Sequence, residues 1–171
     1  MPSDDFVKML FVSASEKYGD KYIEHLLEQY KIYLTGIEKI SDRRQKANEF
    51  FLALNAALVT ILGFVTAKQN QGDHIPIVTL AAAAGMLICY LWYRMVRSYK
   101  GLNEGKFKVI HMIESRLPLA LYDTEWEIMG RGKNRNIYWP FTHIELLVPW
   151  IFIVIYFILI LAMMFWRPFL H

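Results

Sequence analysis

The residue types that most often carry catalysis or bind metals are scattered along this chain of 171 residues. Its five histidines are isolated from one another: His25, His74, His111, His143 and His171. None has a Cys, a Glu or a second His at the spacing of a metal site, and the motifs H-E-x-x-H and G-x-S-x-G do not occur. The sequence therefore predicts no catalytic residue, no metal and no cofactor, and we expect a protein that is not an enzyme.

A basic loop, "GRGKNRN" at residues 130–136, is the stretch that comes nearest to a phosphate-binding motif. It lacks the full Gly-x-x-x-x-Gly-Lys-Ser/Thr frame and a preceding strand. Two interpretations remain open: contact of Arg131, Lys133 and Arg135 with anionic lipid headgroups, or retention of the loop in the cytoplasm by its charge alone. Nucleic-acid binding is not expected, because the basic residues of the chain interleave with acids and adjoin apolar segments.

Two amides stand at or inside the first strongly apolar segment. Asn48 and Asn55 are seven residues apart and so lie on roughly one helical face. An amide that faced lipid would be unfavourable. We expect this face to look toward a neighbouring helix or subunit, where Asn–Asn or Asn–Arg hydrogen bonds could fix the register.

Small residues recur at four-residue spacing in the apolar segments, as Ala53 with Ala57 and as Ala81 with Gly85. Such pairs let helix backbones approach closely, so we predict that they form inter-helix or inter-subunit contacts. Cys89, the single cysteine, lies in an apolar run and is interpreted as a packing residue.

Three segments, residues 50–67, 75–93 and 146–166, are long and apolar enough to cross a bilayer. The whole chain is 55% hydrophobic and 15% aromatic, which exceeds what a soluble domain of this size needs. The predicted fold class is an all-α polytopic membrane protein with three transmembrane helices. It has a long N-terminal cytoplasmic helix leading into the first span and a small helical cytoplasmic segment between the second and third spans.

The positions of Lys and Arg predict the orientation. Of the 19 basic residues, 17 fall within residues 1–49 and 94–140. The positive-inside rule then places the N-terminus in the cytoplasm and the C-terminus outside. The predicted regions are cytoplasmic 1–49, first span 50–67, external turn 68–74, second span 75–93, cytoplasmic 94–145, third span 146–166 and external tail 167–171. Arg94 and Arg97 are expected to reach the headgroups from the second span.

The cytoplasmic regions are predicted to be helical. Residues 20–46 carry an apolar seam at heptad spacing: Ile23, Leu26, Tyr30, Tyr33, Ile37 and Ile40. The seam could pack on the chain's own cytoplasmic part or pair with neighbouring subunits. Because no Pro or Gly occurs between residues 38 and 62, this helix and the first span are predicted to be one helix of ~70 Å. Another helix ends before Pro118, and Asp123 or Thr124 is expected to cap a short helix after it.

The junction "ISDRRQKANEFFLALNAAL", residues 40–58, resembles the signature of the RipA family of octameric bacterial inner-membrane proteins. The residues that carry the resemblance are Arg43, Arg44, Gln45, Ala47, Asn48, Phe50, Phe51, Leu52, Asn55, Ala57 and Leu58. The resemblance covers about residues 20–165. It implies a homo-octamer in the bacterial inner membrane and no particular molecular activity.

Three functional hypotheses follow. The first is a non-enzymatic homo-oligomer, octameric by the resemblance, that acts as a scaffold or regulator among membrane lipids. The second is an oligomeric channel or pore, in which the first span lines the axis with Asn55 and Thr60. The third is a membrane effector of a defence system, for which neighbouring genes would be informative and no sensor domain is visible in the sequence. The sequence names no protein partner.

Overall fold

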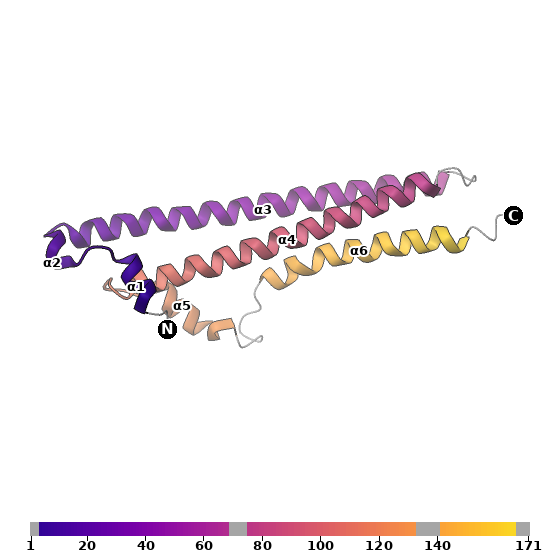
Figure 1. Ribbon diagram of the computed structural model, residues 1–171. Coiled ribbons are helices and arrows are strands. Elements are labelled where there is room, and N and C mark those ends of the chain that lie inside the picture. Colours follow the sequence, from indigo (N-terminus) through magenta and orange to yellow (C-terminus); the bar gives the residue numbers. More distant parts are fainter. Residues whose placement is uncertain (1–3, 69–74, 133–140, 167–171) are drawn as a thin grey trace. The chain divides into compact units, whose positions relative to one another are not determined.

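The computed structural model describes residues 4–68, 75–132 and 141–166, and within these ranges it contains helices and no strands (Figure 1). The elements in chain order are α1 (Asp4–Leu10), α2 (Ser15–Tyr18), α3 (Tyr22–Lys68), α4 (Ile75–Glu114), α5 (Leu121–Ile128), the 3₁₀ turn η2 (Gly130–Gly132) and α6 (Phe141–Trp166). Three of them, α3, α4 and α6, are long and apolar enough to cross a membrane. The predicted fold class is therefore confirmed.

The long helix predicted at the N-terminal side is also present, since α3 is a single helix of 47 residues. The sequence did not predict that the second span and the helix before Pro118 are likewise continuous. Both belong to α4, which has 40 residues and contains Gly101 and Gly105. A helical glycine costs only about 1 kcal/mol against alanine, and no proline occurs between Pro76 and Pro118 to interrupt the helix.

The chain divides into two compact units, and each is described by itself. The first, here called the membrane unit, comprises residues 44–98 and 141–171. Its described part packs α4 against α3 and α6 around a core of Leu62, Val78, Ala82, Cys89 and Tyr156. The buried residues of α4 recur at alternating spacings of four and three: Val78, Ala82, Gly85, Cys89, Trp92 and Val96. This is the heptad pattern of closely packed, nearly aligned helices.

The second unit, here called the polar unit, comprises residues 1–43 and 99–140. Its core joins α3 to α4 through Tyr30, Ile37, Ile110 and Ile113. Of the two partners considered for the heptad seam, its centre therefore packs on the chain's own α4. The first residue of the seam, Ile23, is 54% exposed and takes no part in this core.

The rest of the seam borders this core. Leu26 and Tyr33 are partly buried against it. The ammonium of Lys106 lies over the ring of Tyr33, 4.7 Å from the ring centroid.

The short helix α5 begins earlier than predicted. Ala120 occupies the N-cap position and offers no side-chain hydrogen bond. Asp123 and Thr124 lie inside the first turn, and the Thr124 hydroxyl donates to the Ala120 carbonyl. The predicted cap was therefore wrong, and the physical reason is that Glu114 of α4 takes over the capping of α5, as the next section describes.

Candidate functional site

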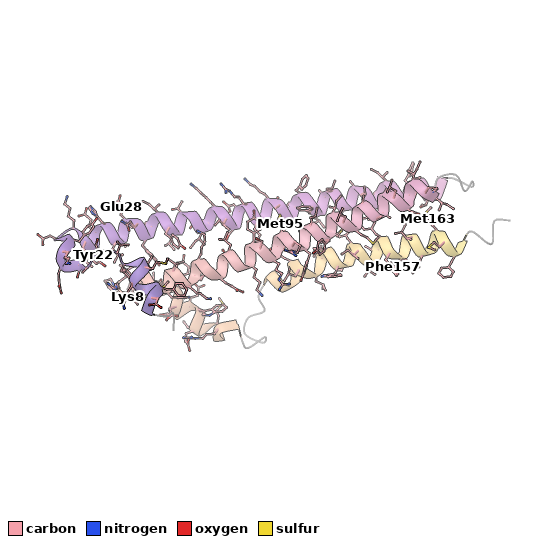
Figure 2. All side chains as sticks on the ribbon, in the orientation of Figure 1. Lys8, Tyr22, Glu28, Met95, Phe157 and Met163 are labelled. Atoms are coloured by element: carbon pink, nitrogen blue, oxygen red, sulfur yellow. The ribbon has the colours of Figure 1, made fainter. Side chains whose placement is uncertain are left out.

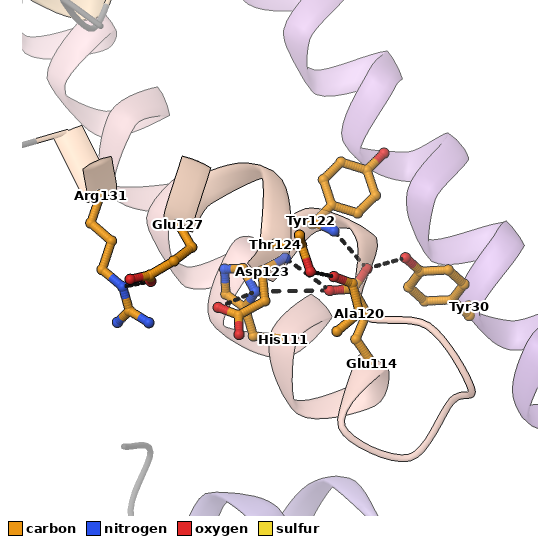
Figure 3. A network of polar contacts seen from close by, with 9 residues as sticks. All are labelled: Tyr30, His111, Glu114, Ala120, Tyr122, Asp123, Thr124, Glu127 and Arg131. Atoms are coloured by element: carbon orange, nitrogen blue, oxygen red, sulfur yellow. Dashed lines mark hydrogen bonds and ion pairs between the residues drawn. The ribbon is translucent and has the colours of Figure 1, made fainter. Parts of the chain in front are cut away.

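Among the described residues, we distinguish three clusters of polar side chains that link the helices. The mid-span cluster contains Asn55, Cys89 and Tyr156, and the boundary cluster contains Arg44, Asn48, Trp92 and Glu145. Both belong to the membrane unit. The Glu114 cluster contains Tyr30, His111, Glu114, Tyr122 and Asp123 and belongs to the polar unit (Figure 3).

In the mid-span cluster, the amide of Asn55 is fully enclosed by the three long helices. Its Oδ1 accepts the Tyr156 hydroxyl at 3.0 Å and the Cys89 thiol at 3.1 Å. Its Nδ2 donates to the Phe51 carbonyl one turn back on α3, at 2.8 Å. A polar group in an apolar interior is tolerated when it is hydrogen-bonded. The amide thus links α3 to α4 and α6 within one chain.

Gly85 makes this arrangement possible. A Cβ atom built at Gly85 would lie 2.5 Å from Cζ of Tyr156 and 2.9 Å from a methyl group of Leu58. The absent side chain therefore leaves the space that the Tyr156 ring occupies against α4. Of the predicted pair Ala81 and Gly85, Gly85 is where the Tyr156 side chain of α6 approaches α4 closely. Ala81 is only half-buried.

The boundary cluster is built around Asn48. Trp92 Nε1 donates to Asn48 Oδ1 at 2.8 Å, and Asn48 Nδ2 donates to Glu145 Oε1 at 3.1 Å. The second oxygen of Glu145 accepts no hydrogen bond within the described chain. Instead, it lies 3.7 Å from Arg44 Nη1. Arg44 thus supplies the opposite charge that a half-buried carboxylate needs.

Asn48 and Asn55 therefore share one face of α3, and Phe51 lies between them with its ring stacked on Trp92 at 5.8 Å between centroids. Within the described chain, the side-chain partners of the two amides are Trp92, Glu145, Cys89 and Tyr156, and Asn55 also bonds to the Phe51 carbonyl. Among the described residues, the Asn–Asn and Asn–Arg hydrogen bonds that the sequence suggested could form here are not seen, because indole, thiol and phenol donors engage both amide oxygens.

Glu114 is the last residue of α4, and its side chain is buried. Its Oε1 accepts the Tyr30 hydroxyl at 2.9 Å and the Tyr122 amide at 3.0 Å, and its Oε2 accepts the Asp123 amide at 3.2 Å (Figure 3). The first amides of a helix have no intrahelical acceptor, and negative charge is favourable there. Glu114 thus caps α5 from another helix, which explains how Ala120 can occupy the N-cap position.

The remaining titratable members of this cluster face each other at its edge. Nδ1 of His111 lies 3.5 Å from Oδ1 of Asp123 and 4.0 Å from Oε2 of Glu114, with no hydrogen bond to either. Burial, followed by the bond to Glu114, raises the pKa of Tyr30 well above its ordinary value. Tyr30 therefore remains a hydrogen-bond donor throughout the physiological pH range.

The hydrogen bonds of Glu114 give it a structural role at the start of α5. Both oxygens of Glu114 are already engaged by fixed donors, so the carboxylate is not free to take a proton from a substrate. In the part of the chain that the structure describes, no three His, Cys, Asp or Glu side chains gather as a metal site would require.

The other residues singled out from the sequence lie on the outer surface of the described chain. Arg43, Gln45, Phe50, Ala53, Ala57, Arg94 and Arg97 are exposed. Gln45 donates to Glu49 at 2.9 Å. Arg131 of η2 is exposed and pairs with Glu127 of α5. The φ angle of Arg131 is 52°, and the glycines on either side of it also have positive φ. The proposed headgroup ligands Lys133 and Arg135 fall outside the described residues.

Sequence reasoning missed Tyr156 and Glu114 as members of these clusters. A signal for Glu114 was present, because an acidic residue at the C-terminal end of a helix opposes the helix dipole and needs another reason to be there. Tyr156 had a weaker signal. It is a phenol in the middle of the most apolar segment, where a hydroxyl requires an acceptor.

A polytopic membrane protein of three long helices, held together by polar contacts within one chain, is the class that this fold and these clusters define. The model of the family described as "Octameric membrane protein family (8xMP)" matches residues 27–165. The chain belongs to this octameric membrane protein family, in agreement with the family resemblance seen in the sequence. The match extends over parts of both units. No curated protein and no solved structure matches the chain.

Proposed function

We propose that the chain is the subunit of a homo-octamer in the bacterial inner membrane, where it acts as a non-enzymatic scaffold or regulator. The observation that carries this proposal is the small share of each span that its own chain buries. In the most apolar window of α3, α4 and α6, 11%, 28% and 11% of the residues are buried, respectively. Figure 2 displays the side chains that project from the three helices.

The exposed surface of the spans is of two kinds. Large apolar side chains, such as Phe157 at 53% exposure, suit lipid as well as protein. Ala53 and Ala57 on α3 are also exposed, whereas Gly85 on α4 is already covered by Tyr156. Exposed small residues at four-residue spacing allow a second helix to approach closely. The pair Ala53 and Ala57 is therefore the candidate surface for contact between subunits.

Native mass spectrometry of the full chain in mild detergent tests the assembly. We expect a species of about 160 kDa, eight times the 20.1 kDa chain. Ala53→Leu with Ala57→Leu should reduce this species in favour of smaller ones, because bulkier residues keep helices apart. Ala83→Leu with Ala84→Leu, on an exposed part of α4, is the matched control and should leave the octamer intact. A wild-type protein that runs as a monomer would contradict the proposal.

We further propose that catalysis is not the principal activity. The buried carboxylate that most resembles an active-site acid, Glu114, has its oxygens engaged by Tyr30 and by two backbone amides of α5. A regulatory or scaffolding role asks only that the polar unit keep its shape.

The distribution of charge supports a proposed orientation for this subunit. With 17 of the 19 basic residues in residues 1–49 and 94–140, we place the N-terminus in the cytoplasm and the C-terminus outside. An alkaline phosphatase fused after His171 should be active in whole cells. If that fusion is inactive while a separate fusion inserted within residues 68–74 is active, the C-terminus lies in the cytoplasm and the proposed direction of the third span is wrong.

The channel hypothesis has less support, because Asn55 has no exposed surface with which to line an axis. Thr60 is exposed, but its hydroxyl donates to the Ala56 carbonyl on its own helix. Planar-bilayer recordings should give no current from the purified oligomer. A current that Asn55→Leu abolishes would restore the channel hypothesis over the scaffold.

A further inference from the structure

We propose that Arg94, Arg97 and Ser98 of α4 form a binding site for the phosphate of an anionic phospholipid headgroup. The three residues follow i, i+3, i+4 spacing, so their side chains share one face of α4. Among the described residues they line a pocket of about 510 Å³ that is open to its surroundings. An open pocket of this size can admit a phosphodiester with a small polar head.

The charge of this site is uncompensated by the described chain. Neither Arg94 nor Arg97 has a carboxylate within ion-pair distance among the described residues, although Arg44 and Arg131 each have one. Their only hydrogen-bond partners in the described chain are neutral phenols: Arg94 donates to the Tyr90 hydroxyl and Arg97 to the Tyr93 hydroxyl, each at 3.4 Å. Two adjacent guanidinium groups without an acid attract an anion, and phosphate matches their planar donor geometry.

The direction of the two side chains points to lipid as the source of that phosphate. Tyr90 and Tyr93 precede the arginines by one turn, so both guanidinium groups lean back toward the apolar segment of α4. A charge that leans toward the bilayer needs its counter-charge at headgroup depth. Tyr93 in turn contacts Trp150 of α6 edge to face, and aromatic residues of this kind are typical of the membrane interface.

The site should discriminate between lipid classes. Phosphatidylcholine and phosphatidylethanolamine carry their own cation beside the phosphate, which would face two guanidinium groups, whereas phosphatidylglycerol carries none. Arginines that merely reach the headgroup layer would also attract anionic lipids, but they would not bind a fixed number of them per subunit. This inference rests on the proposed function in one respect, because it takes this end of α4 to lie at the cytoplasmic surface of the inner membrane.

The test counts lipids bound to the full-length wild-type complex by native mass spectrometry, titrated with phosphatidylglycerol or phosphatidylcholine. We expect saturable binding of phosphatidylglycerol at one per subunit. The double variant Arg94→Gln and Arg97→Gln should weaken this binding roughly thirtyfold, since each basic residue near a membrane surface contributes about a fivefold factor. The second variant Arg94→Lys and Arg97→Lys should recover part of the affinity through charge alone.

The matched control removes two cations at the same spacing from α3. Arg43 and Lys46 are exposed and also separated by three residues, and Arg43→Gln with Lys46→Gln should leave phosphatidylglycerol binding unchanged. Equal loss in both double variants, equal binding of phosphatidylcholine, or displacement of the lipid by millimolar inorganic phosphate would overturn the proposal. The same spectra report the oligomer mass, so a wild-type complex that is not octameric would refute the assembly while the lipid counts still decide the site.

Discussion

Two buried tyrosine hydroxyls meet different acceptors in the two units of this chain. In the polar unit, Tyr30 donates to the carboxylate of Glu114, whose other donors are backbone amides at the start of α5. In the membrane unit, Tyr156 donates to the neutral amide of Asn55, which also accepts the Cys89 thiol. A carboxylate can be buried in the polar unit because a helix N-terminus stabilises it. At mid-span, the membrane unit instead links its helices through an uncharged amide, where an unpaired charge would be far more costly.

The largest expected effect comes from removing the carboxylate. Glu114→Ala leaves the buried Tyr30 hydroxyl and the partly buried Tyr122 and Asp123 amides without their acceptor, and an unsatisfied buried donor costs about 1–3 kcal/mol. We expect a loss of roughly 3–5 kcal/mol in the free energy of unfolding, measured by thermal or chemical denaturation in mild detergent. Far-ultraviolet circular dichroism should also report the loss of α5.

Two variants sharpen this prediction. Glu114→Gln keeps one acceptor oxygen and should lose less than half as much stability. Glu104→Ala removes an exposed acid paired with Lys100 at 3.9 Å, and its effect should be near zero. Equal losses for Glu114→Ala and Glu104→Ala would show that Glu114 does not cap α5.

The next effect concerns packing in the membrane unit. Gly85→Ala places a methyl group within 2.8 Å of two ring atoms of Tyr156, which must then move. Overpacking of this kind costs about 1–3 kcal/mol, and unfolding by sodium dodecyl sulfate in mixed micelles would measure it. Gly63→Ala is the matched control, because nothing lies within 4 Å of a Cβ atom there. Tyr156→Leu should relieve most of the strain of Gly85→Ala, and additive losses in the double variant would contradict the close contact.

The smallest effects compare the two hydroxyls directly. Tyr30→Phe removes a hydrogen bond to a buried carboxylate, for which we expect a loss of about 1.5–3 kcal/mol. Tyr156→Phe removes a hydrogen bond between membrane helices, for which about 0.6 kcal/mol is typical. Both variants can be measured in the same denaturation assay. If Tyr156→Phe lowered the free energy of unfolding more than Tyr30→Phe does, the hydroxyl bonded to the amide would contribute more than the one bonded to the carboxylate, which would contradict the comparison.

The pKa of Tyr30 adds a dependence on pH. Because burial raises its pKa above the unfolded value near 10, the folded state keeps the proton that the unfolded state releases. The stabilisation is therefore complete below about pH 10 and decreases as the pH rises from there toward the folded pKa. The Tyr30→Phe protein should lose less stability between pH 9 and pH 11 than the wild type does.

Much of this architecture could be predicted from the sequence, for physical reasons that particular residues illustrate. The three spans follow from hydropathy, and the length of α3 follows from the absence of proline in residues 38–62, whereas the continuity of α4 was not predicted. That Asn55 must avoid lipid follows from the energetics of an amide in a membrane. The partners of Asn55 could not be predicted, because Cys89 and Tyr156 lie 34 and 101 residues away and only the packing of three helices brings them together.

The start of α5 was mispredicted for a related reason. Local sequence rules look for the cap next to the helix, and Asp123 or Thr124 satisfied them. The actual acceptor, Glu114, precedes Ala120 by six residues and belongs to another helix. Glu114 reaches the start of α5 only because the turn that contains Pro118 brings the two helices together.

Our central inference is that the polar groups of the mid-span cluster are used within each subunit and do not face water. Cys89 reports on this directly, because it is the only cysteine of the chain, is fully buried and donates to Asn55. Wild-type protein in native membranes can be treated with a small, water-soluble maleimide and the label counted by mass spectrometry. The account predicts no labelling until the membranes are dissolved in denaturing detergent, when one label per chain should appear. Rapid labelling of Cys89 in intact membranes would show that water reaches the mid-span cluster, and would contradict the account.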